Sequence, residues 1–435
     1  MTAALRLPVE WPPRPPPPPA PLPRLPPATC RSCGAELTHT VVDLGMSPLG
    51  ASCRCADQLD QTELFSPLRL CVCERCLLVQ LPQRISDERI VSAYAHFSSS
   101  SASRLEHARR FTDRAIEELR LTPATVVVEV GSNDGYLLQY FSDRGIAVLG
   151  IEPWDEAARA AIARGIPTRI EFFSSDTARA LRAEGIHADL LIGNDVLAQV
   201  RDVNDFAAGM KLLLAPRGVI TLEFPHLMRL VAENQFDAID HAHCSYFSLL
   251  AVAHILTANG LTIYDVDELD TRRGSLRVFA CHSEDPLRPI TPRVDSLLAR
   301  ERDAGVHLPA YYAEFAERVR EGKRRLLDFL IAARRDGKRV VAYGATETSS
   351  TLLHYCGIDT DFLEYVVDRR TDTHGKYLPG THIAIRPPAW IRQTRPDYVL
   401  ILPWKLQHEI AAELAYIAGW GGRCVVPIPE VDMVT

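Results

Sequence analysis

The sequence has no apolar run long enough to cross a bilayer. A membrane-spanning helix needs roughly 18 or more consecutive apolar residues, and strand-like runs such as 398–402 stop far short of that length. The sequence also has no excess of positive charge, because 48 Lys and Arg face 55 Asp and Glu, for a formal net charge of −7. The composition therefore disfavours a membrane protein and a nucleic-acid binder.

The N-terminal segment lacks the apolar core of an export signal. Twelve of the 31 prolines lie within residues 1–27, and the run Pro15–Pro19 interrupts any apolar stretch of the length that a signal needs. We expect residues 1–28 to be a polyproline II or disordered tail, with a ligand for a proline-reading domain as the alternative. Without an export signal we expect a cytoplasmic protein, in which clustered cysteines are more typical of metal sites than of disulfides.

Seven of the 11 cysteines lie close together in the sequence, between positions 30 and 76. Four of them form two Cys-x-x-Cys pairs with 39 residues between the pairs: Cys30, Cys33, Cys73 and Cys76. Two such knuckles can close a four-sulfur zinc site that stabilises a fold rather than doing chemistry. Three further cysteines leave the choice of ligands open: Cys53, Cys55 and Cys71. Unligated thiols, a redox pair and a nucleic-acid-binding zinc ribbon are the weaker alternatives.

From residue 125 onward, short apolar runs alternate with helical segments, which is typical of a parallel sheet flanked by helices. We expect strands at 126–130, 147–151, 188–192 and 218–224, and in a second unit at 339–343, 362–367, 398–402 and 423–427. A helix is expected at 136–141, and the charged segment 295–337 reads as a helical connector. The predicted class is α/β, and the predicted domains are a tail (1–28), a zinc-binding domain (29–85), a central α/β domain (86–294), and a connector with a C-terminal α/β domain (295–435).

The turn after the first α/β strand has the form G-x-x-x-G rather than the G-x-G-x-x-G of dinucleotide-binding proteins. It comprises Gly131, Ser132, Asn133, Asp134 and Gly135. A wide loop of this kind suits S-adenosylmethionine (SAM), which has no pyrophosphate but does have an amino-acid end. Glu152 closes the second strand, where a carboxylate can accept both ribose hydroxyls. Asn194 and Asp195 follow the next strand and should border the same pocket.

Longer strings resemble a known family, the zinc-containing C-methyltransferases that methylate carbon 3 of nucleotide-linked 4-keto deoxysugars in antibiotic pathways. The resemblance covers about residues 28–432, and its strings lie at 67–81, 129–135, 150–153, 165–168, 234–237, 274–278 and 375–380. It implies a class I methyltransferase core of Rossmann-like fold, an N-terminal zinc lobe and a C-terminal Rossmann-like α/β domain. It also implies SAM and structural Zn²⁺ as cofactors, with a sugar nucleotide held between the core and the outer domains.

The chain departs from this family on the substrate side, whereas the cofactor loop is nearly intact. Where the family reads N-N-V-L-A-H-V, the chain has Gln199 in place of the histidine. Where the family reads Y-H-E-H-F-S-Y, its tyrosine and glutamate are replaced by Asp240 and Ala242. An aromatic residue is replaced by His96, and the usual H-G before G-S-L-R is Arg272-Arg273. The asymmetry indicates a protein that still binds SAM but uses a different acceptor or a different base.

Carbon methylation needs a base that removes a proton from an acidic carbon. Histidine titrates near working pH, so we expect His243 to be the base, with His241 as the second candidate and a purely structural role for both as the alternative. Asp240 lies three residues before His243 and can orient it or raise its basicity. Tyr246 is either an acid or a core aromatic, and Gln199 either binds a substrate oxygen or only lines the pocket.

Further residues are candidates for the acceptor site. Arg277 can bind a phosphate bidentately, and Arg273 adds positive charge beside it, unless both lie on a solvated loop; His96 is a third candidate. Trp404 follows a C-terminal strand and either stacks on a base or sugar or is buried in the core. We expect the C-terminal unit to form a wall of this site, or else to be structural or to form a dimer, and the oligomeric state stays open.

The leading hypothesis is a SAM-dependent C-methyltransferase acting on a nucleotide-linked keto deoxysugar or a related small metabolite. One alternative keeps the cofactor but replaces methyl transfer with cyclisation or isomerisation, since family catalytic residues are missing. Another is a protein that only binds its ligand. Nothing in the sequence calls for a nucleic-acid or membrane partner.

Overall fold

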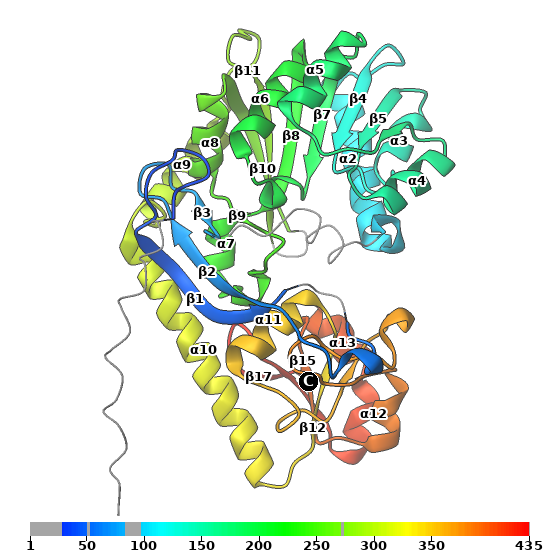
Figure 1. Cartoon of the computed structure of the whole chain (residues 1–435), viewed down its shortest axis with the longest axis vertical. Coiled ribbons are helices and arrows are strands. Elements are labelled where there is room, and N and C mark those ends of the chain that lie inside the picture. Colours follow the sequence, from blue (N-terminus) through cyan, green and yellow to red (C-terminus); the bar gives the residue numbers. More distant parts are fainter. Residues whose placement is uncertain (1–27, 50–52, 83–96, 271–273, 435) are drawn as a thin grey trace, which may run out of the picture.

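The computed structural model describes residues 28–49, 53–82, 97–270 and 274–434. Two α/β units lie one above the other and are joined along one side by a long helix and a narrow N-terminal lobe (Figure 1). The Pro-rich segment 1–27 lies outside the described residues, as do His96 and Arg273, which were predicted at the acceptor site.

The N-terminal lobe is a four-stranded antiparallel sheet in the order β1-β2-β3-β9. Its strands are β1 (His39–Pro48), β2 (Phe65–Val72), β3 (Val79–Gln80) and β9 (Ser245–Tyr246). The first three belong to the cysteine-rich segment, whereas β9 is contributed by a segment 165 residues further along the chain than β3. This long-range pairing ties the N-terminal lobe to the central unit, and no local sequence pattern predicts it.

The central unit (residues 97–282) is built on a seven-stranded sheet in the order β10-β11-β8-β7-β4-β5-β6. Its strands are β4 (Val126–Val130), β5 (Ala147–Ile151), β6 (Thr168–Arg169), β7 (Ala188–Asn194), β8 (Leu214–Pro225), β10 (Leu261–Leu269) and β11 (Ser275–His282). Strands β4 to β8 are parallel, as the alternating pattern predicts, while β10 and β11 add an antiparallel edge beside β8. That edge was not predicted as part of the sheet.

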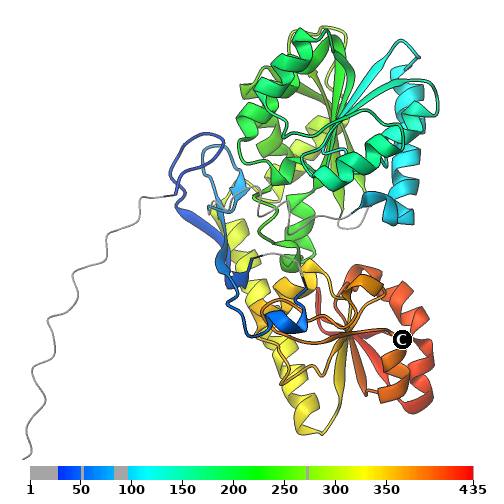
Figure 2. The same ribbon diagram turned by 45° about the vertical axis from the view of Figure 1, so that its right-hand side comes forward.

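Helices cover both faces of this sheet (Figure 2). They are α2 (Ala102–Leu119), α3 (Leu138–Ser142), α4 (Asp155–Ala163), α5 (Ser175–Ala183), α6 (Val203–Leu213) and α8 (Leu249–Ala258). Helix α7 (Leu227–Ala232) lies beyond the end of the sheet, against α10 (Pro309–Arg335) and η4 (Phe236–Ala238). The helix expected at 136–141 begins two residues later, because the glycine-bounded turn runs on through residue 137. Two short 3₁₀ helices, η3 (Leu197–Gln199) and η4 (Phe236–Ala238), lie in the segments that lead to the site.

The charged segment after the central unit forms two helices, α9 (Pro292–Asp303) and α10 (Pro309–Arg335). Helix α10 runs down the side of the molecule and packs against β1, α7 and the first helix of the C-terminal unit (Figure 1). Its buried apolar residues face these elements, while its remaining surface carries Arg–Glu pairs at helical spacing. The predicted connector is therefore also a packing element.

The C-terminal unit (residues 338–434) is a second α/β layer structure with the strand order β14-β13-β12-β15-β16-β17. Its elements are β12 (Val340–Tyr343), α11 (Glu347–Cys356), β13 (Val366–Val367), β14 (Ile385–Arg386), α12 (Ala389–Thr394), β15 (Tyr398–Ile401), η6 (Trp404–Leu406), α13 (Gln407–Glu413), β16 (Arg423–Val426) and β17 (Asp432–Val434). The strand expected at 362–367 is reduced to its last two residues, because Phe362 and Leu363 close a turn on the Asp359 carbonyl.

The largest buried apolar cluster crosses the boundaries of these units. It joins residues of β1 and β2, residues 227–246, α10 and the C-terminal sheet. A second cluster joins three of the paired cysteines to the central sheet. Among the described helices, none is both long and apolar enough to span a membrane. The segment 227–246 therefore lies where the three parts of the molecule meet.

Candidate active site and zinc centre

The two Cys-x-x-Cys pairs lie next to each other at one end of the N-terminal lobe. The sulfur atoms of Cys30, Cys33, Cys73 and Cys76 all lie within 4.8 Å of one another. Sulfurs held about 2.3 Å from a shared tetrahedral ion are about 3.8 Å apart, and the Cys30–Cys76 and Cys33–Cys73 Sγ distances are both 3.4 Å. Small outward shifts of the sulfurs would admit the ion, so the four residues fit zinc.

The other cysteines of the segment do not join this cluster. Among the residues that the structure describes, Cys71 is buried in β2, Cys53 is half-buried, and Cys55 is exposed. Of the seven clustered cysteines, the four of the two Cys-x-x-Cys pairs are therefore the ones whose sulfurs the structure brings together. Gln80 donates a hydrogen bond from Nε2 to the Cys30 sulfur at 3.1 Å, which is the kind of outer contact that orients a metal ligand.

The glycine-bounded loop follows β4 at the carboxyl edge of the central sheet. Gly131 has φ of 72°, and a Cβ atom there would lie 3.2 Å from the Val196 side chain, so glycine is needed for both conformation and space. Glu152, at the end of β5, accepts hydrogen bonds from the Asn133 and Trp154 backbone N–H groups, both at 2.8 Å. Burial raises the pKa of Glu152, although these two bonds oppose the shift. The carboxylate is thus fixed beside the loop.

The side chains of the loop itself are used mainly within the protein. Asn133 Oδ1 accepts a bond from the Ser98 N–H at 2.8 Å, and the buried Asp134 pairs with Arg164 at 3.1 Å. Ser132 is fully buried. Its hydroxyl has no hydrogen-bond partner among the described residues, so Asn133 and Asp134 are the two loop residues whose side chains are seen to hold the shape of the loop.

Glu129, one residue before the end of β4, was not singled out from the sequence as a site residue. It is 1% exposed, and neither of its carboxylate oxygens has a hydrogen-bond partner among the residues that the structure describes. Burial raises the pKa of Glu129 well above the ordinary value, and the charges of Glu152 and Asp134 add to the effect. A buried carboxyl group without a partner, next to the loop, suits a cationic ligand, so the residues present fit SAM with its ammonium and sulfonium charges.

A second polar cluster lies at the end of β8. Glu223 is buried and contacts both Arg277 of β11, its partner in register, and His107 of α2, whose Nε2 is 2.9 Å away. Burial alone would raise the pKa of Glu223, but the charges of Arg277 and His107 hold it below its ordinary value. Arg277 is 3% exposed, and its guanidinium also lies 4.1 Å from the Phe111 ring centroid. The guanidinium that was predicted to bind a substrate phosphate is thus paired inside the protein.

Asn194 and Asp195 lie directly beside this cluster. The Asp195 N–H donates to the Glu223 carbonyl oxygen at 2.8 Å, and Asp195 has φ of 58°. The Asp195 side chain reaches solvent, but surrounding protein displaces part of its hydration. This desolvation raises the pKa of Asp195, and the negative charge of Glu223 raises it further. Asn194 ends β7, and within the described part of the chain its buried Oδ1 has no hydrogen-bond partner. Gln199 is exposed and donates from Nε2 to the Asp195 carbonyl at 3.3 Å.

His243 and Asp240 form a hydrogen-bonded pair in the segment between η4 and β9. His243 Nδ1 lies 2.8 Å from Asp240 Oδ2. The other oxygen, Asp240 Oδ1, accepts the backbone N–H groups of Ala242 at 2.8 Å and His243 at 2.9 Å. Asp240 is 5% exposed, whereas the His243 ring is partly open to solvent. The carboxylate therefore orients the ring and favours the tautomer with the proton on Nδ1 and the basic lone pair on Nε2.

The other two candidates for acid–base chemistry point elsewhere. His241 is buried, its Nε2 lies 3.3 Å from the Pro67 carbonyl of β2, and burial lowers its pKa. The Tyr246 hydroxyl accepts the Asp240 N–H at 3.1 Å and so supports the backbone of the pair. Among the predicted catalytic residues, Asp240 and His243 thus form a hydrogen-bonded pair of side chains.

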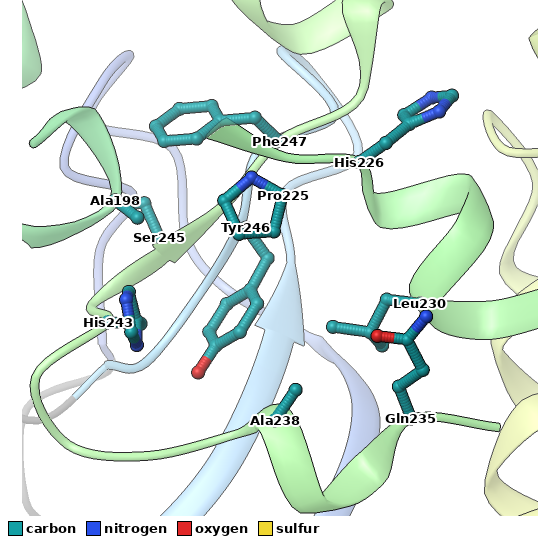
Figure 3. Close-up of a pocket in the computed structure, with 10 residues that line it drawn as sticks. All are labelled: Ala198, Pro225, His226, Leu230, Gln235, Ala238, His243, Ser245, Tyr246 and Phe247. Atoms are coloured by element: carbon teal, nitrogen blue, oxygen red, sulfur yellow. The ribbon is translucent and has the colours of Figure 1, made fainter. Parts of the chain in front are cut away.

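A small hollow with a cavity volume of about 10 Å³, room for about one water molecule, lies against His243 and is partly open to solvent. It is lined by Ala198, Pro225, His226, Leu230, Gln235, Ala238, His243, Ser245, Tyr246 and Phe247. In Figure 3 the His243 ring and the Tyr246 ring stand on one side of the hollow, and Leu230 and Gln235 on the other. The His243 ring is thus part of the wall of this hollow.

Three family models together match most of the chain. A zinc binding domain matches residues 30–90, a methyltransferase domain matches residues 104–266, and a C-methyltransferase C-terminal domain matches residues 270–429. Magnesium protoporphyrin IX methyltransferase from Synechocystis, solved with bound SAM, has a TM-score of 0.32 and 17% identity, and covers 45% of this chain and 89% of its own. A TehB-like SAM-dependent methyltransferase from Corynebacterium glutamicum has a TM-score of 0.31 and 12% identity, with 45% and 93% covered.

The similarity to one relative extends along nearly the whole chain. The C-methyltransferase NovU of Streptomyces niveus is 34% identical over 409 residues, which cover 93% of this chain and 96% of that relative. Such a match includes the zinc centre, the glycine-bounded loop and the C-terminal unit. The chain therefore belongs to the family of SAM-dependent C-methyltransferases with an N-terminal zinc-binding domain.

Proposed function

We propose that this protein methylates a carbon next to the carbonyl group of a nucleotide-linked keto deoxysugar, with His243 as the general base. The observation that carries the proposal is the pair formed by Asp240 and His243 at the edge of the hollow. The family relationship supports the substrate class, because the sequence strings described above resemble enzymes that act on such sugars.

The chain's own residues account for the proton movements. His243 Nε2 takes the proton from the carbon beside the carbonyl, and Asp240 stabilises the imidazolium that forms. The carbon is left as the nucleophile of the new C–C bond, which forms as the sulfur–methyl bond breaks. When bound, SAM supplies the electrophilic methyl group on a positively charged sulfur. The proton then leaves His243 for solvent, so the overall reaction releases one proton for each methyl group transferred.

The residues around the loop are proposed to hold the cofactor. The backbone of the loop from Gly131 to Gly135 approaches it closely, Glu152 accepts its ribose hydroxyls, and Asn194 and Asp195 border it at the next strand. Glu129 offers its buried carboxylate to the positive charge. Arg277 is better suited to fixing Glu223 than to binding the acceptor, because both side chains are buried against each other.

The replacement of family residues changes how the base is held. Asp240 stands where relatives have a tyrosine, and it provides the carboxylate that orients His243. Ala242 stands where relatives have a glutamate, and its buried methyl group cannot take part in proton transfer. We therefore propose that one carboxylate at position 240 does the orienting work in this protein.

The test uses the purified holoprotein, methyl-labelled SAM and a panel of nucleoside diphosphate-linked 4-keto-6-deoxyhexoses, with product analysed by mass spectrometry. A methylated sugar that is formed by the wild type, is lost in His243→Asn and is retained in the exposed control His408→Gln supports the proposal. Sugar consumed while SAM stays intact would instead favour cyclisation or isomerisation. No methylated product from any sugar of the panel would refute the substrate class.

A further inference from the structure

The segment that carries the proposed base is held by side chains from the C-terminal unit. We call residues 236–243, from the start of η4 to His243, the dyad segment. The Trp404 indole Nε1–H donates to Asp237 Oδ2 at 3.1 Å, and the Thr351 hydroxyl donates to the Ile239 carbonyl at 2.9 Å. Asp240 follows directly, so both bonds end within three residues of the carboxylate that orients His243.

These contacts are buried, so breaking them costs more free energy than breaking exposed ones. Trp404 is 7% exposed, Asp237 is 6% exposed, and Thr351 and Ile239 are buried as well. A buried donor or acceptor that loses its partner is costly, so the dyad segment cannot shift without breaking favourable bonds. The Phe236 ring also packs edge-on against Tyr355 of α11, with 5.4 Å between the ring centroids.

Trp404 lies in the buried core, as the second of the two alternatives taken from the sequence has it, and its indole N–H also has a specific acceptor. Its indole is buried against the dyad segment rather than offered to a base or sugar, and its only polar atom points at Asp237. A buried indole N–H usually has an acceptor, and here the acceptor belongs to the segment that carries the proposed base, so Trp404 links the two units. Helix α11, which carries Thr351 and Tyr355, packs on η4 at the junction of the two units (Figure 1).

We propose that Trp404 and Thr351 are positioning residues for methyl transfer, which fix Asp237 and the Ile239 carbonyl and thereby place Asp240 and His243. This inference rests on the proposed role of His243 as the base. It gives the C-terminal unit a task in catalysis that does not require it to touch the reacting atoms. A displacement of about 1 Å at a reacting group can cost on the order of a hundredfold in rate.

The experiment uses the full-length holoprotein with Trp404→Phe and Thr351→Val, each of which removes one hydrogen-bond donor with little change in shape. The chain offers matched controls within the C-terminal unit. Trp420→Phe removes an indole donor to the Pro396 carbonyl, at 2.9 Å, and Thr394→Val removes a hydroxyl donor to the Trp390 carbonyl, also at 2.9 Å. Neither control touches the dyad segment.

Two readouts separate positioning from general structure. With a nucleoside diphosphate-linked 4-keto-6-deoxyhexose that the wild type methylates, kcat should fall about tenfold or more in the two test variants, while the Kd for SAM stays within twofold. Both controls should keep wild-type kcat. Amide hydrogen exchange, which needs no acceptor, should be faster at Ala242 and His243 in the test variants and unchanged in the controls.

The outcomes distinguish this inference from the proposed function. Suppose that the wild type methylates a sugar. The positioning role is then wrong if the test variants keep the wild-type kcat. It is also wrong if their activity falls only in proportion to a drop in melting temperature that the control variants share. If no sugar is methylated, the proposed substrate class fails, and the exchange measurement alone decides: unchanged exchange at Ala242 and His243 overturns the inference, and faster exchange supports it.

Discussion

Replacing Asp240 by asparagine should inactivate the enzyme more severely than replacing it by alanine. In the wild type, Asp240 Oδ1 accepts two backbone N–H groups, and Oδ2 faces His243 Nδ1. An asparagine must keep its oxygen on the two N–H donors, so its NH₂ group would face the ring. The ring would then accept at Nδ1 and carry its proton on Nε2, where the base needs a lone pair.

The magnitude follows from the contacts that are lost. A hydrogen bond involving a charged group contributes about 1.5–3 kcal/mol, so Asp240→Ala should lower kcat/KM by about 10- to 100-fold, at roughly 1.4 kcal/mol per factor of ten. The wrong tautomer adds to this loss in Asp240→Asn. The equivalent change in a Ser-His-Asp triad costs on the order of 10⁴ for this reason, and we expect at least about 10³ here.

The assay is methyl transfer to a nucleotide-linked keto sugar under kcat/KM conditions, with SAM affinity measured by calorimetry as the check on folding. The Kd for SAM should stay within twofold of the wild-type value in both variants, because the hydrogen bonds described for Asp240 all lie within residues 240–246. An asparagine variant that is more active than the alanine variant would refute tautomer control. Full activity in both would remove Asp240 from the mechanism.

Three further predictions follow from the cofactor loop and the zinc centre. Gly131→Ala should weaken SAM binding about tenfold or more in calorimetry because its Cβ meets Val196, whereas Gly145→Ala, with a similar φ of 72° and nothing within 4 Å, should leave the affinity unchanged. Burial raises the pKa of Glu129 in the folded protein, so the stability of the wild type should fall as pH rises above about 4.3, the pKa of a glutamate in unfolded chains. Glu129→Gln has no such group, so its free energy of unfolding in urea, measured without SAM, should increase relative to that of the wild type as pH rises. Cys76→Ser should lower the zinc content measured by atomic emission and reduce the melting temperature by about 5 °C or more, while the exposed Cys55→Ser should do neither.

Local patterns were enough to predict much of the fold. The apolar run at 126–130 and its successors mark the parallel strands, because buried strands of such sheets are apolar on both faces. The spacing of Cys30, Cys33, Cys73 and Cys76 predicted a four-sulfur cluster, and the structure confirms that these thiols are neighbours. The spacing within each Cys-x-x-Cys pair fixes the geometry of its turn, so a short stretch of sequence is enough to predict it.

The sequence could not reveal contacts that depend on the packing of distant segments. Strand β9 has only two residues, and it becomes a strand because β3 offers it a partner. The pairing of Glu223 with Arg277 follows from the register of β11 against β8, which no pattern at either position encodes. Glu129 could not be predicted as a site residue, because the sequence does not show that its carboxylate is buried and has no hydrogen-bond partner among the described residues.

The dyad segment is held from both ends by parts of the chain that do not belong to the central sheet. Trp404 and Thr351 hold it ahead of Asp240, and on the far side of His243 the Leu81 N–H donates to the Cys244 carbonyl at 3.0 Å while Gln80 pairs with Ser245 in the β3–β9 ladder. Gln80 also donates to the Cys30 sulfur, so two contacts join the cysteine cluster to Ser245, two residues after the proposed base. A closed four-sulfur site does no chemistry itself. Its position nevertheless implies that loss of zinc should lower kcat before the central sheet unfolds, since the strand that follows His243 would lose the partner that fixes it.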